Sequence, residues 1–288
     1  MNFVALDHVV VAVRDLEAAS VTYESLLGRG PSWRGAHPGL GTANVLFRLD
    51  DTYLELLSPT GAGTLGAQIR ARLDRVGEGL VGFALRTEDA AACSAALRAR
   101  GLAATDPVDG VGHDTATASV RRWRNVLLPE GAARGVLVFA IEHRSPPDAL
   151  PLVAPAAPRA AVSGIDHVVV RTDAPDEAIR CYGDRLGLRL ALDRTFEQWE
   201  ARLLFFRVGG ITVEIAAPAK PAAHPAADDA CWGISWRVPD AEAARARLAD
   251  AGFDVSETRP GRRPDTRVCT VREPTCGVAT LLIEATPR

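Results

Sequence analysis

The strongest constraint on the fold of this chain is an internal repeat. Leu-Asp-His-Val-Val-Val at positions 6–11 returns as Ile-Asp-His-Val-Val-Val at 165–170. Tyr-Leu-Glu-Leu-Leu at 53–57 returns as Thr-Val-Glu-Ile-Ala at 212–216, again 159 positions later. A sequence that repeats at a fixed offset predicts two copies of one structural unit.

An ionisable pair repeats together with the apolar residues. His8 and Glu55 are 47 positions apart, and so are His167 and Glu214. All four lie in apolar, β-branched runs that predict strands. Unpaired charge inside an apolar strand is costly, so packing alone does not explain the pair. The spacing indicates a site in each half.

Each half divides again into two smaller units. A strand-like run is followed by an acidic or proline start signal and an amphipathic helix that ends at a glycine. Extended runs follow each helix, and the last of them carries an acidic residue. The predicted helices cover 15–27, 89–100, 174–186 and 239–251, and the closing strands cover 53–57, 135–142, 211–215 and 277–284. Each unit is therefore predicted to have the order βαβββ, and the fold class to be α+β.

The 288 residues suffice for two domains of ordinary size. A stretch rich in proline and alanine, 148–162, predicts a linker between domains at 1–147 and 163–288. The sequence leaves open whether neighbouring units pair, or whether the first unit pairs with the third. We favour neighbours, because short connections are the rule in protein folds.

Composition and charge indicate which partners are not expected. The net charge of −3 and the pI near 6.1 do not favour nucleic acid or an anionic membrane. Five cysteines without a CxxC spacing indicate reduced thiols, and no secretory signal pattern follows Met1, so we expect a cytoplasmic location. A homodimer is left open.

These segments, with His-Pro-Gly-Leu-Gly-Thr at 37–42, resemble the glyoxalase-like branch of the vicinal oxygen chelate superfamily, which includes glyoxalases, bleomycin-resistance proteins and extradiol dioxygenases. The resemblance covers the whole chain as four modules. It implies that the modules pair into two curved mixed β-sheet cups with helices outside. It also implies that metal ligands project into each cup from the first and last strands of a module.

By this resemblance His8 and Glu55 are metal ligands in the first module, and His167 and Glu214 in the third. Side chains alternate along a strand, so His8 is expected to point into the cup and Asp7 away from it. If the first and third modules paired, these two histidines and two glutamates would form a single site.

The second and fourth modules depart from the pattern. Gly82 and Gly233 stand where a histidine could ligate, but the closing strands keep Glu142 and Glu284. If neighbouring modules pair, each cup is expected to offer one histidine and two glutamates. Such a set suits Fe(II), Mn(II), Co(II), Ni(II) or Zn(II). His143, which follows Glu142, is expected to face the opposite way and not to be a ligand.

The predicted function is metal-dependent chemistry of the isomerase or lyase kind on a small oxygenated metabolite. The resemblance implies that Glu55 or Glu214 acts as the base, and His37 could move a proton at the cup rim. One alternative is a metal-free protein that binds a small molecule or antibiotic, with Trp199, Trp232 or Trp236 on the cup wall. A ring-cleaving dioxygenase is less favoured because of the two glycines. The basic cluster at 121–124 could contact a phosphate or nucleic acid, but one short cluster in a mildly acidic protein is more often the outer face of a strand or a contact to a carboxylate of the substrate.

Overall fold

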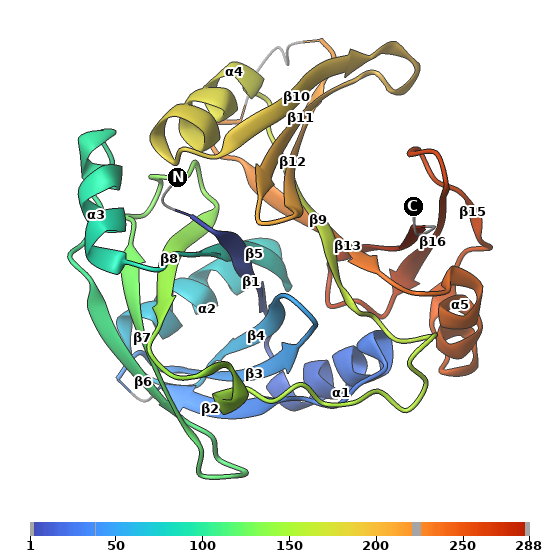
Figure 1. Ribbon diagram of the computed structural model, residues 1–288, viewed down its shortest axis with the longest axis horizontal. Coiled ribbons are helices and arrows are strands. Elements are labelled where there is room, and N and C mark those ends of the chain that lie inside the picture. The colour runs from blue at the N-terminus through green and yellow to red at the C-terminus, as the bar shows by residue number, and fades with distance from the viewer. Residues whose placement is uncertain (1–2, 38, 221–225, 286–288) are drawn as a thin grey trace.

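The computed structural model describes residues 3–37, 39–220 and 226–285, which form two mixed β-sheets (Figure 1). The first sheet has the strand order β2-β3-β4-β1-β5-β8-β7-β6. Its strands are β1 (Ala5–Ala12), β2 (Trp33–His37), β3 (Thr42–Arg48), β4 (Tyr53–Pro59), β5 (Gly79–Arg86), β6 (Val108–His113), β7 (Val120–Leu127) and β8 (Leu137–His143).

The second sheet repeats this plan in the order β10-β11-β12-β9-β13-β17-β16-β14, and β15 pairs with β16 beside that path. Its strands are β9 (Gly164–Arg171), β10 (Arg189–Phe196), β11 (Ala201–Val208), β12 (Ile211–Pro218), β13 (Ala230–Arg237), β14 (Asp254–Val255), β15 (Arg259–Pro260), β16 (Thr266–Glu273) and β17 (Ala279–Ala285).

Neighbouring modules pair within each sheet. The first strands of two modules, β1 and β5, run antiparallel side by side, and β9 and β13 do the same. Inside a module the first and last strands are parallel, as β1 and β4 show. The predicted pairing of neighbours is therefore confirmed, and the first and third modules do not share a sheet.

Aspartates begin three of the helices. The side chains of Asp15, Asp89 and Asp240 each accept a hydrogen bond from the backbone N–H three residues further on, which satisfies a donor that the first helical turn leaves free. The helices are α1 (Leu16–Leu27), α2 (Thr64–Val76), α3 (Ala90–Ala99), α4 (Pro175–Ala178) with the π-helix η2 (Ile179–Arg185), and α5 (Ala241–Asp250), and the short 3₁₀ turns are η1 (Pro147–Ala149) and η3 (Glu197–Trp199).

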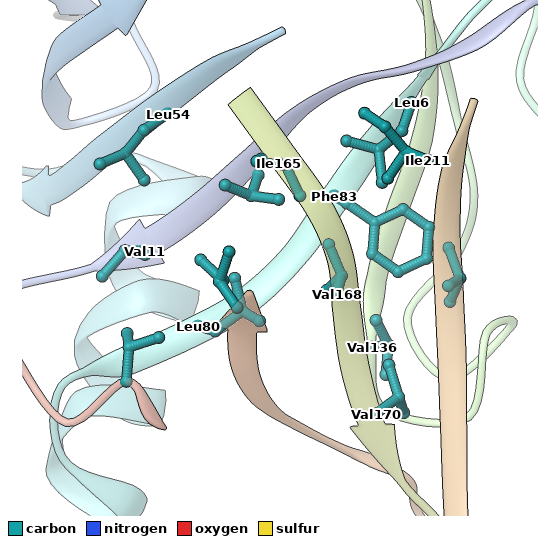
Figure 2. Close-up of a cluster of buried hydrophobic side chains, with 14 of the residues drawn as sticks. Leu6, Val11, Leu54, Leu80, Phe83, Val136, Ile165, Val168, Val170 and Ile211 are labelled. Carbon is teal, nitrogen blue, oxygen red and sulfur yellow. The ribbon is translucent and has the colours of Figure 1, made fainter. Parts of the chain in front are cut away.

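The two halves share one hydrophobic core. Alternate residues of the central strands enter it from both sheets, where α1, α3, α4 and α5 pack against them. Figure 2 shows Phe83 of β5 in one cluster with Ile165 and Val168 of β9. Trp236 is completely buried in this core, so it does not line a cup wall as the metal-free alternative would require.

One helix lies on the other face of the first sheet. Ile69 and Leu73 of α2 pack against Val10, Ala12 and Leu57, whereas the neighbouring Val9 and Val11 belong to the main core. In Figure 1, α2 accordingly lies within the curve of the first sheet. The expectation of helices outside the sheets holds for the other helices, and α2 closes one end of the first cup. Among the described residues, no helix is long and apolar enough to cross a membrane.

Candidate active site

A β-bulge brings Asp7 and His8 to the same place. The register between β1 and β5 shifts between Leu6 and His8, so Asp7 is an extra residue in β1. The strict alternation of side chains is lost there. Asp7 Oδ1 lies 2.7 Å from His8 Nδ1, and the expectation that Asp7 faces away from His8 was wrong. The second half has the same arrangement, with Asp166 Oδ2 at 2.9 Å from His167 Nδ1.

A second histidine completes a buried chain of polar groups. Asp7 Oδ2 lies 2.8 Å from His143 Nε2, so one carboxylate bridges two imidazoles. An ionised carboxylate only accepts hydrogen bonds, and therefore both imidazoles donate to it. This leaves His143 Nδ1 free to exchange a proton. The side chain of Asp7 is 3% exposed, whereas that of His143 is 27% exposed.

Glu55 lies on the far side of His8. Its Oε2 is 3.4 Å from His8 Nε2, and its Oε1 accepts a 2.7 Å hydrogen bond from the side-chain amide of Asn44. The parallel pairing of β1 with β4 places Glu55 opposite Val10, which brings it over His8. His37 hydrogen-bonds Thr42 through Nδ1 at 3.2 Å.

The charges of these polar side chains stabilise one another. Burial opposes ionisation of Asp7, but hydrogen bonds from His143 and His8 hold its pKa well below the ordinary 3.8. Burial also disfavours the charged form of His8, but its bonds to Asp7 and Glu55 raise its pKa above 6.5. Burial works against Glu55 too, and His8 with Asn44 lowers its pKa below 4.5. A cationic His8 between two carboxylates follows from these directions.

The exposed end of this series of polar side chains, at His143, opens into a cavity of about 250 Å³. Asp7 and His143 line it together with Tyr53 and Arg121. The Tyr53 ring stacks on the His8 imidazole at 4.3 Å between centroids. The remaining lining residues come from the turn between β3 and β4, the end of β5, and the segment after β8: Arg48, Leu49, Asp50, Asp51, Thr52, Arg86, Ser145, Pro146, Pro147 and Leu150.

The structure does not bring Glu142 and Glu284 to these groups. Glu142 Oε2 accepts from the backbone N–H of Ala90 at the start of α3, and its other oxygen pairs with Arg144. Glu284 accepts in the same way from Ala241 at the start of α5. Both carboxylates therefore serve helix N-termini on the core side of the sheets. His143 faces opposite to Glu142 as expected, and this orientation directs it to the site.

Apolar residues occupy the ligand positions of the second module. Through the strand registers, His8 corresponds to Gly82 and Glu55 corresponds to Phe139. A Cβ atom at Gly82 would lie 1.9 Å from the carbonyl oxygen of Leu137, so no histidine fits there. Phe139 instead packs its ring edge against His8, with the centroids 5.5 Å apart. Leu281 takes the Phe139 position in the second half.

At the predicted ligand positions, each cup thus offers one imidazole and one carboxylate. Across the described ranges, no three His, Cys, Asp or Glu side chains are arranged to hold a metal ion. The transition-metal sites of enzymes generally use three protein ligands around open positions. The residues present do not fit such a centre, and the predicted set of one histidine and two glutamates is not assembled.

The second half keeps a related but different group. His167 Nε2 and the Ser235 hydroxyl are hydrogen-bonded at 2.8 Å, and Nε2 lies 3.7 Å from Glu214. Burial raises the pKa of Glu214 above 4.5, and the nearby charges of His167 and Arg262 only partly offset this. Arg263 reaches Asp166 at 3.5 Å.

The repeat breaks down at the residues that open the first site to solvent. Thr212 takes the place of Tyr53, and Ala285 takes the place of His143. Within the described ranges, the bridged pair of imidazoles therefore occurs in the first half alone. His143 and Tyr53 were not predicted as site residues, because the sequence signal we followed was the similarity between halves. The short basic run at 121–124 was the one signal that pointed to Arg121.

The other two tryptophans considered for a cup wall lie apart from this site. Trp199 and Trp232 are partly exposed in the second half, where the guanidinium groups of Arg262 and Arg171 lie over their rings. Both belong to the opposite half from the cavity. They are not brought together with His143.

Comparison with known proteins agrees with this architecture. Residues 6–163 match a family model described as a glyoxalase-like domain, and residues 166–270 match that of the glyoxalase/bleomycin resistance protein/dioxygenase superfamily. A segment of 59 residues is 39% identical to an ethylmalonyl-CoA/methylmalonyl-CoA epimerase of Cereibacter sphaeroides. That segment covers 20% of this chain and 44% of the epimerase, so the chain matches less than half the length of this curated relative.

Solved structures show the same fold over the whole chain. A mutant of 4-hydroxymandelate synthase from Streptomyces coelicolor superposes with a TM-score of 0.72 at 17% identity, covering 100% of this chain and 95% of that one. A Mn(II)-bound glyoxalase from Novosphingobium aromaticivorans gives a TM-score of 0.62 at 15% identity, covering 98% and 82%. The chain therefore belongs to the glyoxalase/bleomycin resistance protein/dioxygenase superfamily, the vicinal oxygen chelate group, with a glyoxalase-like domain as its first half.

Proposed function

We propose that this protein is an enzyme that transfers a proton on a small oxygenated metabolite, with His143 as the general acid–base. The single observation that carries the proposal is the hydrogen bond from His143 Nε2 to Asp7 at the wall of the cavity. A histidine held by a buried carboxylate has a fixed tautomer and a free nitrogen for catalysis. The reaction class is that of isomerases, epimerases and lyases.

Asp7 has the positioning role. Its carboxylate remains ionised because two imidazoles donate to it, and it stabilises the cation that forms when His143 accepts a proton. His8 and Glu55 lie behind it, and they fix the carboxylate from the buried side. General acid–base catalysis by a side chain held in this way contributes about 10²–10⁴-fold in rate.

The donor geometry supports acid–base chemistry by the protein's own side chains. The two positions that would complete a metal site hold Gly82 and Phe139, and the former has no room for a side chain. Divalent metal dependence, as in the Mn(II)-bound glyoxalase, is the competing function. It requires donors beyond His8 and Glu55 in one cup, or beyond His167 and Glu214 in the other.

Hydrogen–deuterium exchange at carbon tests the proposal whatever product the reaction forms. The purified protein is incubated in D₂O with small hydroxy- and oxo-compounds, and loss of the C–H signal is followed by proton NMR. We expect at least one compound to undergo exchange, and we expect the rate of this exchange to be unaffected by EDTA. His143→Gln should slow it by about 10²–10⁴-fold. His113→Gln, at an exposed strand end away from the cavity, is the matched control.

Two results would overturn the proposal. One is exchange that needs an added divalent metal and disappears in His167→Gln. The other is exchange that is equally fast in His143→Gln and the wild type. Compounds that bind without exchange would instead favour the metal-free binding function.

A further inference from the structure

We infer that the cavity beside His143 is a carboxylate-binding site in which Arg121 is the counter-ion. The substrate class is then a small carboxylic acid oxygenated at the carbon next to the carboxylate. This assignment of substrate class rests on the proposed function, whereas the assignment of an anion site rests on Arg121 itself.

Arg121 is a buried cation without an acidic partner. It is 6% exposed, and among the residues that the structure describes no carboxylate lies within 4.0 Å of its guanidinium. A buried charge without a counter-ion is costly. The cavity that Arg121 lines is the place from which a counter-ion can reach it.

Two of the three aspartates in the cavity wall are paired elsewhere, and the third, Asp50, is an exposed residue of the turn between β3 and β4. Asp7 shares its two oxygens between His8 and His143, and Asp51 pairs with Arg237 of the second half. Among the basic residues, Arg48 donates to the carbonyl oxygens of Pro147 and Leu150. Among the basic side chains of the cavity wall, Arg121 is therefore the buried one that can bind an anionic ligand.

Three aromatic rings hold the guanidinium in place. Its Cζ lies 5.5 Å from the centroid of Trp33, 5.4 Å from Tyr53 and 5.9 Å from Trp123. Rings at such distances attract a cation by their quadrupoles and restrict its rotamers. A pre-oriented guanidinium presents its paired N–H groups to a carboxylate with little loss of entropy.

Glycines on the neighbouring strand make room for these rings. A Cβ at Gly110 would lie 2.3 Å from Trp123 Nε1, and one at Gly112 would lie 3.1 Å from atoms of both Trp123 and Trp33. The close approach of β6 to the rings thus depends on the absence of side chains at these two positions. This supports a cluster built around Arg121, since exposed arginines need no such arrangement.

The relation of Arg121 to His143 indicates which carbon would react. Trp123 pairs directly with His143 across β7 and β8, and Arg121 is two residues from Trp123 on the same side of β7. Diagonal neighbours of this kind have Cα atoms about 7–8 Å apart. A carboxylate on Arg121 therefore places the carbon next to it within reach of the imidazole. A 2-hydroxy acid such as lactate carries a C–H bond on this carbon, whereas pyruvate has no hydrogen there and serves only as a probe of binding.

Tryptophan fluorescence measures the binding step independently of catalysis, because Trp33 and Trp123 flank the guanidinium. The probes are lactate, pyruvate and malonate, with lactamide as the uncharged analogue of lactate. We expect saturable changes with the acids, and at least tenfold weaker binding of lactamide. Arg121→Gln should weaken lactate binding at least tenfold, and Arg121→Lys should weaken it less. Arg122→Gln, an exposed neighbour on the other face of β7, should bind as the wild type does.

The possible failures are separable. Equal binding of lactate and lactamide, or unchanged binding in an Arg121→Gln protein with a native circular dichroism spectrum, would overturn the carboxylate site. If Arg121→Gln does not fold, Arg121→Lys is the variant that tests the carboxylate site. Wild-type affinity of Arg121→Lys for both lactate and lactamide would also overturn that site. Binding that depends on Arg121 without any exchange at carbon would leave the site standing and remove the proposed function. Exchange at carbon that is confined to uncharged compounds would overturn the carboxylate site and leave the proposed function standing.

Discussion

At the scale of residues, the site depends on a single carboxylate with two imidazole donors. Asp7 is nearly inaccessible, so its charge is stabilised by His8 and His143 and little by water. The sequence predicted His8 and Glu55 as partners, and they lie 3.4 Å apart. It could not predict Asp7 as a third partner, because a bulge in β1 sets its direction and a bulge leaves no reliable mark in the amino-acid pattern.

Substitution Asp7→Asn should change the pH dependence of stability. The pKa of Asp7 is lowered in the folded protein, so its contribution is present above about 3.8 and is lost as the pH falls through the folded value. The pKa of His8 is raised, so its contribution is present below 6.5 and is lost as the pH rises through the folded value. The pair therefore stabilises the fold most between these limits.

Urea unfolding across this range provides the measurement. Near pH 5 we expect Asp7→Asn to lower the free energy of unfolding by about 3–5 kcal/mol, the range for a broken buried ion pair. The difference from the wild type should shrink on the alkaline side as His8 loses its charge. Asp109→Asn, which removes only an exposed pair with Arg124, is the control. A deficit that is constant across the pH range would contradict an ionised Asp7 in contact with a cationic His8.

At the scale of elements, the contact between β5 and β8 decides which side chains can enter the cup. The sequence correctly marked Gly82 as the gap in the histidine pattern. It could not show that the gap is sterically fixed, because the clash is with the carbonyl oxygen of Leu137, more than fifty positions away in the chain. In the same register, Phe139 occupies the position that corresponds to Glu55. The Glu142 carboxylate instead accepts a hydrogen bond from the backbone at the start of α3.

Gly82→Ala should destabilise the protein although the added group is one methyl. Its Cβ would meet Leu137 backbone and side-chain atoms at 1.9–2.6 Å, and overpacking of this kind costs about 1–3 kcal/mol. Gly61→Ala, where a Cβ meets nothing within 4 Å, should leave the free energy of unfolding nearly unchanged. Thermal and urea unfolding of both variants test this. Equal stability of the two would show that β5 and β8 can separate enough to admit a ligand-bearing side chain.

At the scale of the whole molecule, duplication explains the fold better than it explains the site. The repeat predicted four modules, and the pairing of neighbours and the aspartate starts of three helices agree with the structure. The two halves then differ where function is concentrated. In the part of the chain that the structure describes, only the first cup carries a helix such as α2 and side chains such as His143 and Arg121. Residues without a counterpart in the other half cannot be found by a comparison between halves.

Histidine NMR gives the most direct test of the claim that His143, oriented by Asp7, is the reactive group of the first cup. The protein is labelled with ¹⁵N-histidine, and the six imidazoles are assigned by single His→Gln variants. We predict that His143 has its proton on Nε2 in the resting protein, and that its signals move on addition of lactate while those of His167 remain in place. A shift confined to His167 or a protonated Nδ1 with a bare Nε2 on His143 would contradict the account.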